Sequence, residues 1–336
     1  MAKRWTGLFA IFSMLCLLAA CVNPGTQEAG QSAPNSGGDG PKRIAFFGFA
    51  KANSFANATF AGIEEYAKAN QAEAEFFDPN FDAQVQLRQI QDAITAKRFD
   101  VFVVQANDGT VVVPALQSAV QNGITVVVEF TPVGTKYDTA LVQVPGTVTL
   151  VDVPVDNGRK LGELGVDACK SKNATPCRVA YLEGMKSLPL DNARTEAVTS
   201  TLRAGGAEVV ASVEGGYTRE SGRKAMQDVL QATPEVDVVI GSSQAIAGAE
   251  GVAQGKGVLL IGNGGSRQAV EAVQQQRWFG ITYVPEKTAG AKAAELGLAK
   301  ARGKQVPEAN SSTDLAAGAG KGTQQTLAGV TGEYDE

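Results

Sequence analysis

Short apolar segments alternate with amphipathic segments along most of this 336-residue chain. The segment from Arg43 to Phe49 (RIAFFGF) is almost continuously apolar, which is typical of a strand that is buried on both faces of a sheet. Phe60, Ile63 and Ala67 then recur at helical spacing. Because strands and helices alternate in this order, the chain is predicted to be an α/β protein with parallel sheets.

The alternation runs to residue 302 with one break. Residues 131–157 have no helical period, so we predict two doubly wound parallel-sheet lobes on either side of them and not one barrel. The predicted strands are 43–49, 74–77, 99–104, 124–128, 179–182, 208–213, 236–240, 258–261 and 280–284. The predicted helices lie around 60–67, 83–94, 114–121, 157–170, 192–204, 220–231, 245–254, 266–276 and 287–302.

The chain contains no histidine. This excludes Ser-His-Asp and Cys-His catalysis and the commonest zinc ligand. A hydrolase that uses two carboxylates stays open, with Glu129 and Glu183 as its candidates. The net charge of −5 argues against a nucleic acid partner. We expect a protein with no catalytic residues, no cofactor and no metal, and therefore not an enzyme.

The first twenty residues are predicted to be an export signal. Lys3 and Arg4 precede a short apolar run that ends in Leu18-Ala19-Ala20-Cys21, which resembles a bacterial lipobox. The resemblance implies lipidation of Cys21, while an ordinary cleavage site is the alternative. Residues 21–41, rich in Gly, Pro, Ser and Asn, are predicted to be the lipidated cysteine and a flexible tether. The expected location is the outer face of the cytoplasmic membrane or the periplasm, anchored by lipid.

Beyond the leader, Cys169 and Cys177 are the two remaining cysteines. They lie at the end of a predicted helix and the start of the next strand. An exported protein meets an oxidising compartment, so we predict a disulfide that closes this turn, with free thiols as the alternative. A metal site is disfavoured, because the chain has neither histidine nor further cysteines nearby.

The residues that follow the predicted strands are the candidates for binding, because ligands of open parallel sheets lie at the carboxyl ends of the strands. In this chain they are mostly amides, hydroxyls and aromatic rings. They include no clustered carboxylates at metal-ligand spacing and no phosphate-binding Gly-x4-Gly-Lys-[Ser/Thr] loop. Such residues suit hydrogen bonding and ring stacking with a small polar molecule.

Several short motifs resemble one family. They are Asn53-Ser54-Phe55 followed by Gly62, the strand Pro234–Val239 with Gly241, the turn Gly262–Gly265, and Pro285 ahead of the last helix. From Lys42 to about Gly303 the chain resembles the type I periplasmic binding proteins, in particular the ribose-binding-like solute-binding proteins of ABC sugar importers.

The resemblance implies two lobes joined by three crossings of the chain. The N-terminal lobe would comprise 42–155 and 285–312, and the C-terminal lobe 156–284 and 313–336. A small sugar-like molecule would bind between the lobes of a monomer, which would then dock on an ABC permease that carries ATPase subunits. A ligand sensor of the same fold that signals to a membrane receptor is the alternative function.

The resemblance also implies ligand contacts at individual positions. Asn53, Phe55, Gln105, Arg194 and Tyr217 fall on contact positions of the family. The expected ligand-binding set is Asn53, Phe55, Gln105, Phe130, Arg194, Tyr217, Ser243, Gln244, Asn263 and Tyr283. Purely structural roles stay open for four of them: Asn53 as a helix cap, Phe55 as a hydrophobic staple, Arg194 as a solvated residue paired with Asp191 or Glu196, and Tyr217 in a turn.

The chain departs from the family where the family has acidic residues. Phe130-Thr131 replaces an Asp-Arg pair, Ser242-Ser243 replaces Asn-Asp, and Gly264 replaces an Asp. We therefore expect a cleft poor in carboxylates. Such a cleft favours a less hydroxylated, amphipathic or aromatic ligand over a simple aldose.

Overall fold

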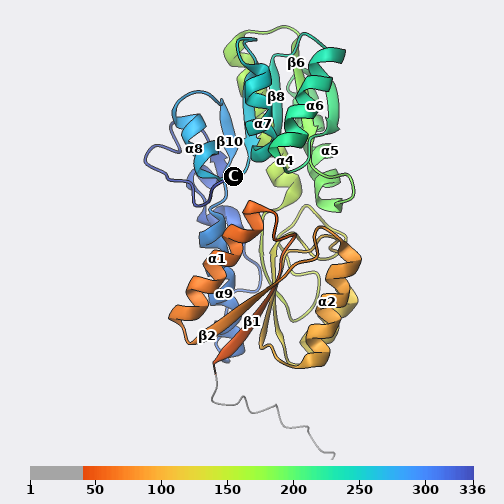
Figure 1. Ribbon diagram of the computed structural model, residues 1–336, viewed down its shortest axis with the longest axis vertical. Helices are drawn as coiled ribbons and strands as arrows, with labels where there is room; N and C mark the ends of the chain where they lie inside the picture. The colour runs from red at the N-terminus through yellow and green to blue at the C-terminus, as the bar shows by residue number, and fades with distance from the viewer. Residues whose placement is uncertain (1–40) are drawn as a thin grey trace, which may run out of the picture. The chain divides into compact units, whose positions relative to one another are not determined.

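The computed structural model describes residues 41–336, in which two sheets are each flanked by helices (Figure 1). The predicted signal peptide, the lipidation of Cys21 and all but the last residue of the tether lie outside this range. None of the helices within residues 41–336 is long and apolar enough to cross a bilayer.

The first sheet has five parallel strands in the order β2-β1-β3-β4-β5. Its central strands are buried on both faces, which explains the apolar runs seen in the sequence. The strands are β1 (Lys42–Phe47), β2 (Ala72–Phe77), β3 (Val101–Val104), β4 (Thr125–Phe130) and β5 (Val148–Val151). The helices that belong with this sheet are α1 (Ser54–Ala69), α2 (Ala83–Ala96), α3 (Val113–Gln121) and α9 (Glu286–Ala301).

The second sheet has six strands in the order β11-β10-β9-β8-β6-β7, and only β11 runs antiparallel to its neighbour. The strands are β6 (Cys177–Glu183), β7 (Ala207–Glu214), β8 (Val238–Ser242), β9 (Leu259–Asn263), β10 (Gly280–Thr282) and β11 (Lys321–Gly322). The helices are α4 (Pro154–Lys172), α5 (Pro189–Ala204), α6 (Arg219–Ala232), α7 (Ser243–Ala253) and α8 (Arg267–Gln274), followed by the 3₁₀ turns Ser312–Leu315 and Ala317–Gly320.

The predicted fold class is confirmed, with three differences in detail. The aperiodic stretch 131–157 contains β5, which pairs in parallel with β4. Helix α4 begins at Pro154, before the expected start at 157. Strand β11, two residues long, was not predicted. Strands this short leave no periodic pattern of their own, so their pairing becomes visible only in the sheet.

The chain passes between the two sheets three times. It crosses first between β5 and α4, and again between β10 and α9. The third crossing follows Ser311, which pairs with Val151 in an isolated bridge before the chain enters β11. These crossings lie beside the carboxyl ends of β5 and β10, so residues of the crossings come close to the loops that end the strands.

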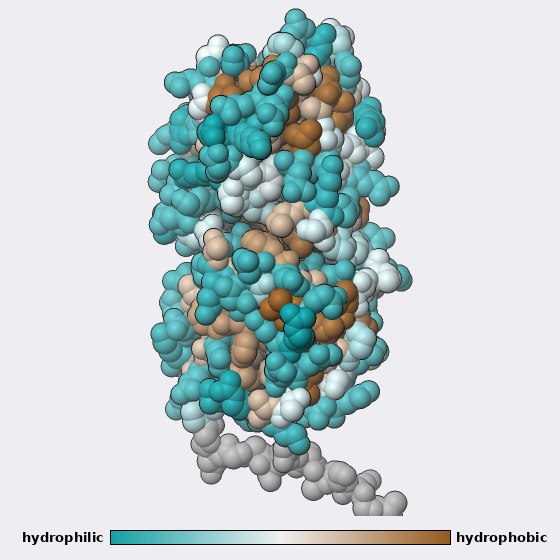
Figure 2. All heavy atoms as spheres, turned by 45° about the vertical axis from the view of Figure 1, so that its right-hand side comes forward, coloured by the Kyte–Doolittle hydropathy of each residue, from teal (hydrophilic) through white to brown (hydrophobic). Residues whose placement is uncertain are grey.

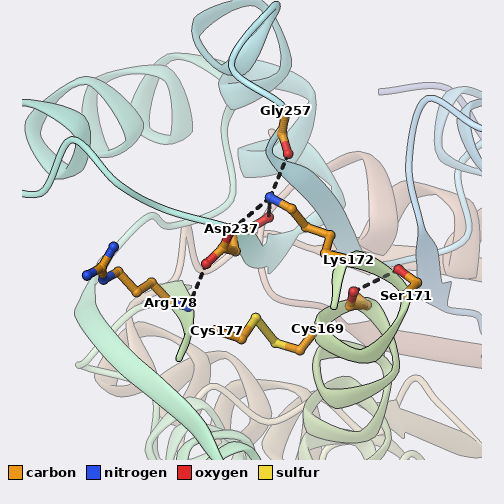
Figure 3. Close-up of a disulfide and its surroundings, with 8 residues drawn as sticks. Cys169, Ser171, Lys172, Cys177, Arg178, Asp237 and Gly257 are labelled. Atoms are coloured by element: carbon orange, nitrogen blue, oxygen red, sulfur yellow. Dashed lines mark hydrogen bonds and ion pairs between the residues drawn. A yellow bond between two sulfur atoms is a disulfide. The ribbon is translucent and has the colours of Figure 1, made fainter. Parts of the chain in front are cut away.

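The predicted disulfide is present: Cys169 of α4 is bonded to Cys177 at the start of β6 (Figure 3). Closing so short a loop contributes about 2–3 kcal/mol on the chain-entropy account. Beside it, Lys172 Nζ donates 2.9 Å bonds to Asp237 Oδ1 and to the carbonyl of Gly257. The turn is therefore fixed both covalently and through a bridge to the start of β8 and β9.

Helices α1 and α9, which are distant in sequence, pack side by side (Figure 1). Glycines permit this close approach. A Cβ on Gly62 would lie 1.8 Å from the carbonyl oxygen of Lys287, and one on Gly290 would lie 2.0 Å from that of Thr59. The backbone contact fixes the position of α9 on the first sheet.

Substitution of Gly62 by alanine is therefore expected to destabilise the protein. The methyl group must displace the backbone of α9, and overpacking of this kind costs about 1–3 kcal/mol of unfolding free energy. Gly251→Ala in α7 is the control, because nothing lies within 4 Å of its Cβ position. That control should gain up to about 1 kcal/mol from helix propensity. Urea unfolding of both variants measures the difference, and equal effects would contradict the packing argument.

Candidate functional site

A cleft between the two sheets is lined by loops from the carboxyl ends of strands of both. The space-filling view shows tan and brown residues beside a furrow about half-way down the face that it presents (Figure 2). The lining residues are Phe49, Asn53, Phe55, Phe81, Phe130, Asp152, Leu188, Leu190, Tyr217, Gln244, Asn263, Gly264, Thr282, Val284, Glu286 and Tyr334.

Phenylalanine rings form the wall of the cleft on the side of the first sheet. The rings of Phe55 and Phe130 meet edge to face, with centroids 4.6 Å apart. Phe49 contacts both and also stacks on Phe81 at 6.4 Å. Rings held in contact with one another form a rigid apolar surface, suited to the flat or apolar face of a ligand.

Two of these phenylalanines have a strained backbone conformation. Phe81 and Phe130 have φ values of 61° and 57°, in the left-handed region that bulky residues seldom adopt. Such a conformation costs about 1–3 kcal/mol and persists where the surrounding structure holds it. At both positions the left-handed residue lines the cleft.

The opposite wall contains Tyr217, held by a buried charge network. Asp191 Oδ1 accepts 2.6 Å bonds from Tyr217 Oη and from Arg194 Nη1. Arg194 and Asp191 are 3% and 2% exposed. Tyr217 therefore faces the cleft in a fixed orientation, and Arg194 supports it from behind.

The structure brings six of the ten predicted residues to the cleft. They are Asn53, Phe55, Phe130, Tyr217, Gln244 and Asn263. The amide of Gln244, on the second sheet's side, lies 3.5 Å from Ser54 Oγ on the first sheet's side. Asn53 also caps α1 through a 2.9 Å bond from the amide of Ala56, so the structural role that the sequence left open is present as well.

The other four predicted residues, Gln105, Arg194, Ser243 and Tyr283, are buried but do not line the cleft. Gln105 donates a 3.0 Å bond to Thr59. Arg194 pairs with Asp191, one of the two partners that its alternative role named, but the pair is buried and not solvated. A sequence indicates that a residue follows a strand, but whether its side chain reaches the cleft or the layer behind it depends on the local backbone.

The sequence did not predict Tyr334. Its carbonyl accepts a 2.8 Å bond from the amide of Arg267, whose side chain forms a bidentate pair with Asp335. Neighbouring Glu333 accepts bonds from Thr288 of α9. The segment 333–335 thus attaches to helices of both sheets, and its tyrosine ring lies 6.4 Å from that of Phe55.

The expectation of a cleft poor in carboxylates is wrong. Asp152 and Glu286 both line it, and each is almost completely buried. Asp152 was not predicted because it follows β5, a strand that the sequence did not reveal. Glu286 follows the predicted strand 280–284, but it was assigned to the last helix and not to the binding residues. Glu129, proposed as half of a catalytic pair, is completely buried outside the lining, and its partner Glu183 does not line the cleft either.

Burial governs the protonation of these acids. It raises the pKa of Asp152 to about 6, against the opposing charges of Arg194 and Lys160. It raises the pKa of Glu129 to about 8. The pKa of Glu286 also lies well above its usual range, because burial is reinforced by the charges of Glu129 and Asp152. Among residues 41–336, no group of three or more acidic or cysteine side chains is arranged to hold a metal ion.

The sequence profile described as "Periplasmic binding protein domain" matches residues 44–305. The chain belongs to the periplasmic binding protein family. A comparison with curated proteins gives no match. The family and its solved members named below consist of binding proteins and not of enzymes.

Three solved structures show that this periplasmic binding protein shares its fold with solute-binding proteins of ABC transporters. One from Bacillus halodurans, with bound myo-inositol, has a TM-score of 0.72 at 19% identity over 88% of this chain and 98% of its own. One from Mycobacterium smegmatis, with glycerol, has a TM-score of 0.71 at 22% identity over 88% and 100%. One from Actinobacillus succinogenes, with D-allose, has a TM-score of 0.69 at 20% identity over 80% and 95%.

The structure shows what surrounds Gly264, the position at which the resemblance expects an Asp. Gly264 has φ of 142°, and a Cβ there would lie 2.4 Å from Ser243 Oγ and 3.1 Å from Tyr334 Oη. A side chain at this position of the binding protein would therefore collide with Ser243 and crowd the hydroxyl of Tyr334. The tyrosine occupies space next to the position where the resemblance expects a carboxylate.

The raised pKa of Glu129 predicts how the stability of this binding protein changes with pH. The folded protein holds this proton more tightly than the unfolded chain, so the carboxyl stabilises fully below pH 4.5 and progressively less as the pH rises to 8. Glu129→Gln, which keeps a neutral group there, should become more stable than the wild type by on the order of 3–4 kcal/mol at pH 8. Unfolding titrations from pH 4.5 to 8 measure the gain.

Glu295→Gln, on the exposed side of α9, is the control for the loss of one carboxyl. A Glu129→Gln variant whose stability relative to the wild type did not change with pH would contradict a buried, protonated Glu129.

Proposed function

We propose that this protein is an extracytoplasmic solute-binding protein that captures a small polar molecule in the cleft and delivers it to an ABC importer. The observation that carries the proposal is the cleft itself, lined from both sheets by six aromatic rings and by the side-chain amides of Asn53, Gln244 and Asn263. Such a lining orients a ligand by stacking and hydrogen bonding. The sugar and polyols bound to the similar structures support a sugar or a sugar-like molecule with an apolar face.

The proposed capture uses two lobes, 42–155 with 285–312 and 156–284 with 313–336. The three crossings would serve as the hinge, and closure would bring the phenylalanine wall toward Tyr217. A ligand that contacts both walls binds the closed arrangement better and so stabilises it. The closed monomer would then be the form that docks on the permease and its ATPase subunits.

The same proposal includes a lipid anchor at Cys21. Cleavage before Cys21 and lipidation of its sulfur would hold the protein at the cell envelope. The tether of about twenty residues would then give the binding domain a reach on the order of 25 Å.

Binding of a neutral solute is expected to raise the melting temperature of the chain from residue 22. A ligand at about 100 times its Kd adds about 2.7 kcal/mol, which corresponds to several degrees for a protein of this size. Gln244→Ala should weaken binding about fivefold to tenfold, because a ligand hydrogen bond is lost. Gln231→Ala on the exposed part of α6 is the control. If no small solute shifts the melt and native mass spectrometry finds none bound, the proposed function is wrong.

Lipidation is tested separately in cells that express the full chain. Labelled palmitate should be incorporated into the wild type and not into Cys21→Ala, which should leave the membrane fraction. Cys169→Ala is the matched control, because it also removes one cysteine. A Cys21→Ala protein that stayed labelled and membrane-bound would contradict the anchor and leave the binding function standing.

A further inference from the structure

Three carboxyl groups are buried together where the first two crossings meet the first sheet. Glu129, Asp152 and Glu286 are 0%, 2% and 1% exposed, and each affects the charge of at least one of the others. Asp152 and Glu286 line the cleft, whereas Glu129 lies behind it. The acids therefore face the space where the proposed ligand binds.

None of these three acids takes part in an ion pair among the residues that the structure describes. Asp152 Oδ2 accepts a 2.7 Å bond from Asn157, but its Oδ1 has no partner within the described chain. Glu286 Oε2 is likewise without a partner there. Two buried carboxyl oxygens beside the cleft thus lack a hydrogen-bond partner within the described chain, and a ligand group could supply one when the lobes open to admit it.

The nearest cations are already engaged by other carboxylates. Arg194 and Lys160 both act on Asp152 through their charge. Arg194 pairs with Asp191 at 2.6 Å, and Lys160 pairs with Asp156 at 2.8 Å. Among the lining residues that the structure describes, Asp152 and Glu286 carry the formal charges, and both are acidic. The cleft therefore has an excess of negative groups.

A buried carboxyl group can avoid an unpaired charge in two ways. It can hold a proton, or it can take a cation as its partner. The raised pKa values of Glu129 and Glu286 indicate the first state for these two acids in the ligand-free protein, whereas Asp152, with a pKa of about 6, holds its proton only below neutral pH. The second state needs a cation that enters the cleft from outside.

The aromatic lining favours an organic cation. Six aromatic rings line the same cleft: Phe49, Phe55, Phe81, Phe130, Tyr217 and Tyr334. Ring faces attract ammonium groups, and the attraction grows when both are removed from water. The rings also offer an apolar surface to the rest of such a molecule. Neutral Tyr334 adds a buried hydroxyl, without a partner in the described residues, that can bond to a polar group of the ligand.

We infer that the ligand of this cleft carries a protonated amine, which pairs with Asp152 and Glu286 while its apolar or ring-shaped body packs on Phe55 and Phe130. This inference rests on the proposed function and names the chemical class of its ligand. A neutral sugar or polyol, to which the protonated acids would donate hydrogen bonds, is the competing outcome.

Proton release accompanies this binding mode. The ammonium replaces protons on the two acids, so the affinity for the amine should rise as the pH rises through the pKa of Asp152, about 6, and rise further as Glu286, whose pKa lies higher, becomes able to ionise. The charged groups that face Asp152 are Arg194 of α5 and Lys160 and Asp156 of α4. Those that face Glu286 are Glu129 of β4, Asp152 and Glu333. Arg194 and Lys160 lower the pKa of Asp152, whereas the acids around Glu286 raise the pKa of Glu286.

Matched pairs of ligands test the inference on the mature chain. Each pair exchanges an amine for a hydroxyl: D-glucosamine and D-glucose, an aminodeoxyinositol and myo-inositol, and phenethylamine and 2-phenylethanol. We expect the amine of at least one pair to bind at least about tenfold more tightly than its neutral partner, as a charge-assisted bond to a buried acid requires. Calorimetry in two buffers of different ionisation enthalpy should show proton release at pH 7.

Two variants localise the effect. Glu286→Gln and Asp152→Asn should each abolish the preference for the amine, and Glu295→Gln, the same change on the exposed side of α9, should keep it. The inference is overturned if no amine binds more tightly than its neutral partner, or if Glu286→Gln leaves the preference intact. Tight binding of a neutral sugar that no amine of the three pairs exceeds would overturn the inference and support the proposed function. Failure of every neutral and amine ligand would count against both.

Discussion

The backbone contact between α1 and α9 positions the cleft. Gly62 and Gly290 let the two helices approach until the main chain of each touches the other. Helix α9 enters this contact directly after the second crossing, so its first residue, Glu286, comes to lie at the cleft. With α9 placed on the first sheet, the chain must cross a third time to add β11 to the second. The position of α9, and with it the third crossing and the place of Glu286 at the cleft, thus depends on Gly62 and Gly290.

Most of the fold could be predicted from the sequence because parallel strands buried on both faces produce apolar runs, and the crossover helices between them have a clear period. The structure contains every helix and strand predicted on that basis. The two strands that were not predicted have no such pattern. Val148–Val151 is a four-residue strand next to β4 with no crossover helix, and β11 has only two residues. Their place depends on pairing with strands distant in the chain.

The site was less predictable, because deciding which residues line the cleft requires knowing the direction of each side chain. Placing candidates after the strands identified Asn53, Phe55 and Tyr217 at the cleft, yet Gln105 follows β3 equally closely and is buried behind it. The acids were missed for a different reason. The resemblance to the family places carboxylates at particular positions of the sequence. At two of these positions this chain has Phe130 and Gly264 instead. Asp152 and Glu286 bring acidic groups to the same space from the crossings, at positions that the motifs did not identify as ligand contacts.

The position of these two acids joins ligand chemistry to lobe movement under the proposed function. Asp152 lies at the first crossing and Glu286 at the second, so the interaction between their charges belongs to the hinge itself. A ligand shifts the balance between arrangements only through a difference in its affinity for them. An ammonium that bonds to both acids draws the two crossings together electrostatically, whereas a neutral ligand provides no such attraction. The same two carboxyl groups would then select the ligand and favour the arrangement in which Tyr217 meets the phenylalanine wall.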